Sequence, residues 1–151
     1  MQELLNEAKR LASEGVKELV LVAQETTLYG KDLTGEKQLP LLLHELCKIE
    51  GIEWIRLLYC YPEEITDELI KVIKTEEKVC NYIDMPIQHS ENRILQRMGR
   101  RTSREDLVAV IKKLRKEIPD ITIRTTLITG FPGESQEDHE GLMNFVEECQ
   151  F

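Results

Sequence analysis

Residues 18–27 read Glu18-Leu19-Val20-Leu21-Val22-Ala23-Gln24-Glu25-Thr26-Thr27, an apolar run that ends in polar side chains. A continuous apolar run is typical of a parallel strand that is buried on both faces. Three later apolar segments end similarly, in Leu58-Tyr59-Cys60-Tyr61-Pro62, Met85-Pro86-Ile87-Gln88-His89-Ser90 and Ile128-Thr129-Gly130-Phe131-Pro132-Gly133-Glu134. Because parallel strands bring their carboxyl ends to one edge of a sheet, where ligands of α/β proteins bind, we expect these four ends to line one site.

Helical periodicity separates the apolar runs. We expect helices over residues 2–14, 39–50, 66–74, 92–98, 103–118 and 135–149, strands over 18–23, 54–58, 79–85 and 121–128, and a loop over 28–37. Gly15 is expected to end the first helix, and Thr66, Ser103 and Ser135 to cap later ones. A helix followed by four strand–helix units predicts an α/β fold with a parallel sheet and outer helices. We interpret residues 1–151 as a single domain, a partial TIM-like (β/α) barrel truncated at both ends, whose edge strands lack partners.

Composition restricts the possible partners. The chain has 151 residues, 41% hydrophobic and 32% charged, which is enough for one domain with a core. It contains neither a membrane-spanning apolar run nor a signal peptide, so we expect no membrane association. A net charge of −8 argues against a broad nucleic-acid surface. The four cysteines lack the close spacing of metal ligands, which favours reduced thiols and a cytoplasmic location.

The first strand end offers a carboxylate beside an amide and two hydroxyls, in Gln24, Glu25, Thr26 and Thr27. A carboxylate in this position can accept hydrogen bonds from a ligand ammonium group. The alternative is a capped loop whose polar groups are solvated.

The third strand end carries Gln88, His89 and Ser90. Gln88 and Ser90 can pair with ribose-type hydroxyls, although Ser90 could instead cap the following helix. His89 is a candidate for a direct role, with a structural histidine as the alternative.

Arginines and a glycine turn complete the candidate set. Arg124 lies among apolar neighbours, so it must bind a substrate carboxylate or form an ion pair inside the barrel. Arg100 belongs to an arginine-rich stretch suited to carboxylate or phosphate, unless that stretch is a solvated helix face. Gly130 lets a flat ligand lie against the backbone. Together these groups suit an amino-acid nucleotide.

Over nearly its whole length, the chain resembles the radical S-adenosylmethionine methylthiotransferases. The resemblance rests on four ordered motifs: Val22-Ala23-Gln24-Glu25-Thr26-Thr27 with Tyr29-Gly30, Tyr59-Cys60-Tyr61-Pro62, Asp84-Met85-Pro86-Ile87-Gln88-His89-Ser90, and Thr126-Leu127-Ile128-Thr129-Gly130-Phe131-Pro132-Gly133-Glu134. The Gln-x-Thr-Thr, Tyr-Cys-Tyr-Pro and Gln-His-Ser elements look like the RimO branch, which modifies an aspartate of a small-subunit ribosomal protein. A sister branch modifies tRNA adenosine.

The resemblance implies two cofactors, S-adenosylmethionine and a 4Fe-4S cluster that cleaves it to a radical. It implies that residues 24–27 meet the methionine amino group, that Gln88 and Ser90 lie near the ribose, and that Arg100 or Arg124 binds the carboxylate. Ile128, Gly130 and Phe131 would flank the adenine, and Tyr59 and His89 would face the substrate. The family's C-x-x-x-C-x-x-C cluster motif is not found in this chain, so no metal ligand or catalytic residue is assigned and the segment alone is expected to be inactive.

Two other hypotheses remain open. The segment could be a non-catalytic binding or assembly domain, which the missing cysteines favour and the intact strand-end motifs oppose. It could also be a phosphate-handling β/α barrel enzyme, but it lacks a clear phosphate loop and an acid–base pair.

Overall fold

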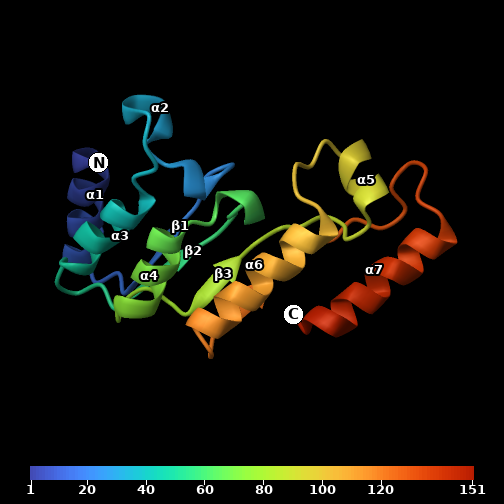
Figure 1. Ribbon diagram of the computed structural model, residues 1–151. Helices are drawn as coiled ribbons and strands as arrows, with labels where there is room; N and C mark the ends of the chain where they lie inside the picture. The colour runs from blue at the N-terminus through green and yellow to red at the C-terminus, as the bar shows by residue number, and fades with distance from the viewer.

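The computed structural model describes residues 1–151 and contains seven α-helices and four parallel strands, with two short 3-10 turns (Figure 1). In chain order the elements are α1 (Gln2–Ser13), β1 (Glu18–Leu21), η1 (Thr26–Leu28), α2 (Lys31–Thr34), α3 (Leu39–Cys47), β2 (Trp54–Leu57), η2 (Pro62–Glu64), α4 (Asp67–Thr75), β3 (Tyr82–Asp84), α5 (Asn92–Arg97), α6 (Arg104–Glu117), β4 (Thr122–Arg124) and α7 (Gln136–Cys149). None of the helices combines the length and apolar composition needed to cross a membrane.

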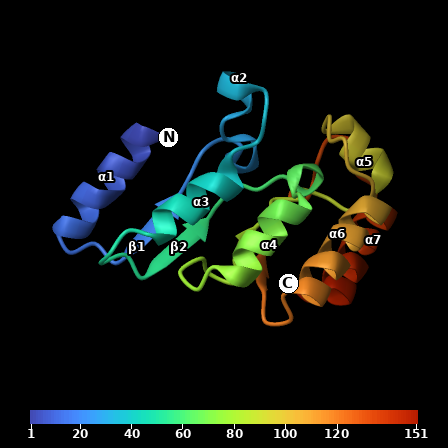
Figure 2. The ribbon, with the colours of Figure 1, turned by 60° about the vertical axis from the view of Figure 1, so that its left-hand side comes forward.

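The strands follow one another across the sheet in chain order. β1 pairs in parallel with β2, and β3 pairs in parallel with β4. Backbone hydrogen bonds join the pairs, among them Ile55 N–H to Lys78 O (2.7 Å), Cys80 N–H to Ile55 O (2.9 Å) and Cys60 N–H to Asp84 O (2.9 Å). α1 and α7 lie at opposite ends of the molecule in both ribbon views, so the sheet is open (Figures 1 and 2). This arrangement confirms the predicted partial barrel.

The outer helices cover one face of the sheet, as the row formed by α1, α3, α4 and α6 shows (Figure 2). The core lies between these layers, where Leu43, Ile55, Leu57 and Ile83 are completely buried. On the other face, Arg56 Nε donates to Glu18 Oε1 at 2.6 Å, and the Arg56 guanidinium lies 4.8 Å from the centre of the Tyr82 ring. The face of the sheet without helices is therefore partly polar.

The prediction that the first strand is buried on both faces is wrong. Leu19 is 8% exposed, but Val20 and Val22 are 47% and 60% exposed. The helices pack against the Leu19 and Leu21 face only, and β1 has a hydrogen-bonded neighbour on one side only. An open sheet leaves the opposite face of its edge strand uncovered, whatever the sequence of that strand.

The third and fourth strands end earlier than predicted because a side chain interrupts their ladder. Thr125 Oγ1 donates to Met85 O at 2.9 Å and accepts from Ile87 N–H at 3.3 Å, in place of backbone pairing. Parallel pairing then resumes as a single bridge between Gln88 and Leu127. The predicted loop at 28–37 also differs from the structure, because it contains α2.

The helix boundaries follow the expected caps. Thr66 caps α4 by accepting from Leu69 N–H, and Gly15 follows α1 with a φ of 91°. Ser103 and Ser135 each form a complete capping box with the aspartate three residues later. These signals use only neighbouring residues, so they can be predicted from the sequence.

Candidate active-site edge

Hydrogen bonds hold the four strand ends together at one edge. Thr26 Oγ1 donates to Leu58 O at 2.6 Å, and Thr26 N–H donates to Tyr59 O at 3.0 Å. The third and fourth ends are joined by a bond from Gln88 N–H to Thr126 O at 2.9 Å. This confirms that the four segments meet, and the sequence-predicted site residues are distributed along this edge.

Glu25 has one carboxylate oxygen that is bonded and one that is free. Oε1 accepts from Thr27 N–H at 3.0 Å and Tyr61 N–H at 3.3 Å, and also from the Thr27 hydroxyl. Oε2 is buried and has no hydrogen-bond partner. Burial raises the pKa of Glu25, although the bonds from Thr27 and Tyr61 oppose this rise. A buried, unpartnered acceptor is costly unless a ligand satisfies it, so Oε2 is suited to an ammonium donor.

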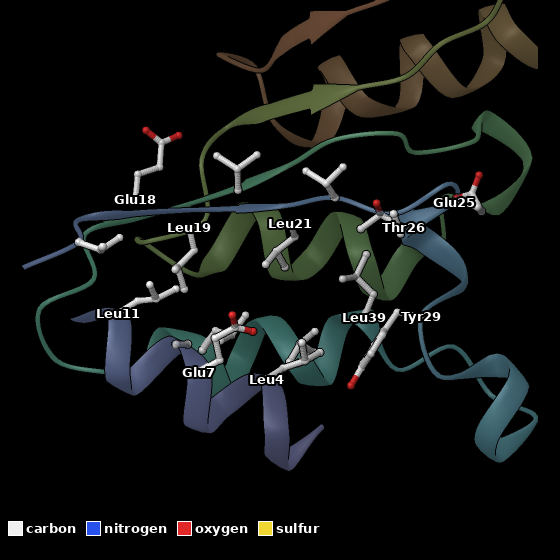
Figure 3. A pocket seen from close by; sticks show the side chains of 17 residues that line it. Leu4, Glu7, Leu11, Glu18, Leu19, Leu21, Glu25, Thr26, Tyr29 and Leu39 are labelled. Atoms are coloured by element: carbon white, nitrogen blue, oxygen red, sulfur yellow. The ribbon is translucent and has the colours of Figure 1, made fainter. Parts of the chain in front are cut away.

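The neighbours of Glu25 have different exposures. Thr26 and Thr27 are buried and act as structural partners, whereas Gln24 is exposed. Glu25 and Thr26 lie at one end of an apolar cavity of about 430 Å³ between β1, α1 and α3 (Figure 3). Most of that cavity lies on the helix-covered face, so it is not the site that the strand ends form.

Asp84 is a buried carboxylate at this edge that the sequence reasoning did not single out. Its side chain is 1% exposed, and Oδ2 accepts from Tyr59 N–H at 3.1 Å. Its Oδ1 accepts from Arg124 Nη1 at 3.0 Å. Only the position after apolar residues at the end of a strand could have indicated it. Asp84 therefore connects the second, third and fourth strands.

Arg124 forms an ion pair within the protein, which is one of the two roles that the sequence allowed for it. Its side chain is nonetheless 57% exposed, so the role of binding a ligand carboxylate stays a prediction. Tyr59 is 46% exposed and has a φ of 56°, a left-handed conformation that is rare for a bulky residue. Asp84 holds the N–H of Tyr59 and Thr26 holds its carbonyl oxygen. The predicted role of Tyr59 toward a substrate also stays a prediction.

The Gln88–Ser90 segment forms a tight turn. Gln88 has a φ of 72°, and His89 N–H donates to Ile87 O at 3.0 Å across it. His89 is completely buried, and its Nδ1 accepts from Glu91 N–H at 3.0 Å. Ser90 does not cap α5, whose first flanking residue is Glu91, and instead its hydroxyl donates to Glu91 Oε1 at 3.2 Å. Gln88 alone of the three is partly exposed, so it is the best placed for a ligand hydroxyl.

The glycine turn follows the last strand end. Ile128 is 41% exposed and Gly130 has a φ of 72°. Phe131 N–H donates to Glu134 Oε2 at 2.8 Å, and Glu134 N–H donates to Phe131 O at the same distance. Burial opposes the ionisation of Glu134, but the Phe131 N–H and the adjacent His89 ring hold its pKa below the ordinary value.

Arg100 is engaged in contacts within the protein. Its Nη2 donates to Pro86 O at 3.0 Å, and its guanidinium lies 4.5 Å from the centre of the Tyr61 ring. Its Nε is buried without a partner. Arg100 thus connects the second and third strand ends, and one of its donors remains free.

The cysteines do not form a cluster site. Cys47, Cys60, Cys80 and Cys149 are all free, and no group of three or more histidine, cysteine or acidic side chains is placed to hold a metal ion. Burial raises the pKa of Cys60 to about 12 and that of Cys47 to about 11, so both remain protonated thiols. Because the four thiols are not grouped as ligands, these residues do not fit an iron–sulfur cluster.

The family model for the radical SAM superfamily matches residues 1–146. The chain belongs to the radical SAM superfamily. A solved radical S-adenosylmethionine methyltransferase, TsrM from Kitasatospora setae, superimposes with a TM-score of 0.76 at 17% identity, covering 99% of this chain and 29% of that one. TsrM in that structure carries cobalamin and a [4Fe-4S] cluster. At this identity the likeness shows the fold alone.

Curated relatives are much closer in sequence than TsrM. The ribosomal protein uS12 methylthiotransferase RimO of Lachnoclostridium phytofermentans is 64% identical over 151 residues, which are 100% of this chain and 34% of the relative. The RimO of Alkaliphilus oremlandii is 56% identical over the same coverage, and that of Clostridium perfringens is 59% identical over 97% of this chain and 33% of its own length. This radical SAM chain spans about a third of the length of the curated relatives it matches.

Proposed function

We propose that these residues form the S-adenosylmethionine-facing part of a radical methylthiotransferase that modifies an aspartate of ribosomal protein uS12. The choice of acceptor is supported by 56–64% identity to relatives that carry the uS12 methylthiotransferase name over the whole chain. A ribosomal substrate also implies a cytoplasmic reaction, in agreement with the free thiols.

The observation that carries the cofactor assignment is the free Oε2 of Glu25. S-adenosylmethionine has an ammonium group that can satisfy a buried carboxylate oxygen, and Oε2 is the acceptor at this edge that lacks a partner. Gln88 would pair with the ribose, Arg124 or the free donor of Arg100 would bind the carboxylate, and Ile128, Gly130 and Phe131 would flank the adenine. A 4Fe-4S cluster, when bound, supplies the reductive cleavage of S-adenosylmethionine, and its ligands would lie outside these 151 residues.

Substitution of Glu25 tests the cofactor assignment. In the full-length protein with its cluster reconstituted, Glu25→Gln should weaken S-adenosylmethionine binding about 10- to 100-fold, because a charged hydrogen bond contributes about 1.5–3 kcal/mol. Titration calorimetry measures this loss. The exposed Glu36 is the matched control, and Glu36→Gln should bind like the wild type. Equal affinity of the two variants would contradict the assignment.

The acceptor is tested in the same preparation. Mass spectrometry should detect a methylthio group on an aspartate of uS12 and none on tRNA. Modification of tRNA without modification of uS12 would assign the chain to the tRNA-modifying branch instead. Binding of S-adenosylmethionine without modification of either would leave the cofactor assignment standing and refute the acceptor.

A further inference from the structure

The side chain of His89 contains a buried group that the proposed function does not use. Its ring is completely buried, and its Nδ1 is occupied as the acceptor of the Glu91 N–H. The proton of the neutral ring must therefore lie on Nε2, which has no hydrogen-bond partner. Buried polar atoms are almost always satisfied, so an orphaned Nε2 requires an explanation.

The Glu134 carboxylate is the one that lies within 4 Å of Nε2. Oε1 of Glu134 lies 3.7 Å from His89 Nε2 and 3.5 Å from His139 Nδ1. The Glu134 side chain is 4% exposed, so solvent screens it little. A carboxylate from the glycine turn is thus placed between a histidine of the third strand end and a histidine of α7.

The same glycine turn is held from its outer side. Arg93 Nη1 donates to Gly133 O at 3.0 Å, and Arg93 also pairs with Asp138. A Cβ at Gly133, whose φ is 84°, would lie 2.5 Å from Arg97 Nη1. The turn is therefore packed between α5 and His89, and its position depends on the strand–helix unit that precedes it.

We propose that His89 and Glu134 are positioning residues, which act through the Phe131–Glu134 turn to place the predicted adenine contacts against Gln88. The proposal rests on the proposed function, because the contacts at Ile128, Gly130 and Phe131 belong to it. Glu134 positions the turn directly, because its Oε2 accepts a hydrogen bond from Phe131 N–H at 2.8 Å. The Nε2–H of His89 lies 3.7 Å from Oε1 and makes no hydrogen bond in this structure, so it is the donor available to the other carboxylate oxygen.

Two substitutions of His89 separate positioning from simple packing. Asparagine mimics Nδ1, so His89→Asn keeps the acceptor for Glu91 N–H and removes the donor toward Glu134. Glutamine mimics Nε2, so His89→Gln keeps the donor and removes the acceptor. Glu134→Gln keeps an oxygen for Phe131 N–H and removes the charge. His44→Asn is the control for a histidine–glutamate contact away from the site, because the exposed His44 lies 2.7 Å from Glu76.

Hydrogen exchange of residues 130–134 in the full-length protein is the first readout, and it needs no ligand. We expect about tenfold faster exchange in His89→Asn and Glu134→Gln, and exchange close to the wild-type rate in His89→Gln and His44→Asn. Equal acceleration in both His89 variants would overturn the proposal, because it would mark a packing role. Wild-type exchange in His89→Asn would overturn it as well.

Binding is the second readout, with S-adenosylhomocysteine as the probe because it is not cleaved. We expect about tenfold weaker binding in His89→Asn and Glu134→Gln, a higher KM for S-adenosylmethionine, and kcat within about twofold of the wild type. Tight binding by His89→Asn overturns the positioning role. Failure of the wild type to bind refutes the proposed function instead, and the exchange measurement still decides whether His89 and Glu134 hold the turn.

Discussion

Asp84 shows how a single buried side chain organises this edge. Its two oxygens bond to Tyr59 N–H and Arg124, which belong to different strand ends. The sequence predicted Glu25 and Gln88 as candidates because polar groups at strand ends are visible in the chain, and Arg124 because it is a charge among apolar neighbours. It missed Asp84 because nothing local distinguishes a buried bridging carboxylate from a solvated one.

Removal of both hydrogen bonds that Asp84 accepts should destabilise the fold. Asp84→Leu leaves the Tyr59 N–H and the Arg124 guanidinium without their acceptor, and we expect a loss of about 1.5–3 kcal/mol in the free energy of unfolding. Asp84→Asn keeps an acceptor for Tyr59 N–H and should lose less than Asp84→Leu. Urea unfolding of the two variants measures the difference, and equal losses would show that the Tyr59 bond contributes nothing.

At the scale of the elements, helix ends were predicted better than strands. The capping box of α7 joins Ser135 to Asp138, and that of α6 joins Ser103 to Asp106. Each box lies within four residues, so its chemistry can be read directly from the sequence. The strand lengths could not be read in this way, because Thr125 interrupts the ladder by bonding to Met85, which is distant in the chain.

The cap of α7 should be sensitive to acid. Bonds from the Ser135 hydroxyl and N–H, together with Arg93, lower the pKa of Asp138 from 3.8 to about 2. A depressed pKa means that the ionised form stabilises the fold above 3.8 and that this stability is lost as the pH falls toward 2. Asp138→Asn should therefore be less stable than the wild type at neutral pH.

The measurement is urea unfolding of the wild type and the variant along an acid titration. The difference between their midpoints should shrink and vanish as Asp138 becomes protonated. Asp106→Asn is the matched comparison, because the pKa of Asp106 is also lowered by bonds from its serine. A difference for Asp138→Asn that does not depend on pH would refute the electrostatic origin of the cap.

The whole molecule is an open, curved α/β layer with one face covered by helices (Figure 2). The order of the elements and the parallel sheet were predicted correctly, because apolar runs alternate with helical periodicity along the chain. The exposure of Val20 was predicted wrongly. An apolar strand carries no information on whether a neighbour covers it.

Because one side of a helix packs under the sheet and the other faces solvent, two positions of the same helix can be compared in a stability test. Leu43 is completely buried under the sheet, whereas Leu41 is 50% exposed on the same helix, α3. Leu43→Ala should lose about 2–5 kcal/mol of unfolding free energy through lost burial and the cavity left behind. Leu41→Ala makes the same change in helix propensity and should cost about 0.5 kcal/mol. Thermal or urea unfolding compares them, and similar losses would contradict the arrangement of the layers.

The sequence by itself determined the fold class, the helix caps and the four polar strand ends, because these depend on periodicity and on neighbouring residues. Only the tertiary structure decided which of those polar groups are free. It left Glu25 Oε2 and His89 Nε2 buried without partners, and it engaged Arg124, Ser90 and Arg100 in contacts within the protein. The physical reason is that hydrogen-bond satisfaction depends on atoms from distant segments, whose positions are set by the packing of the whole sheet.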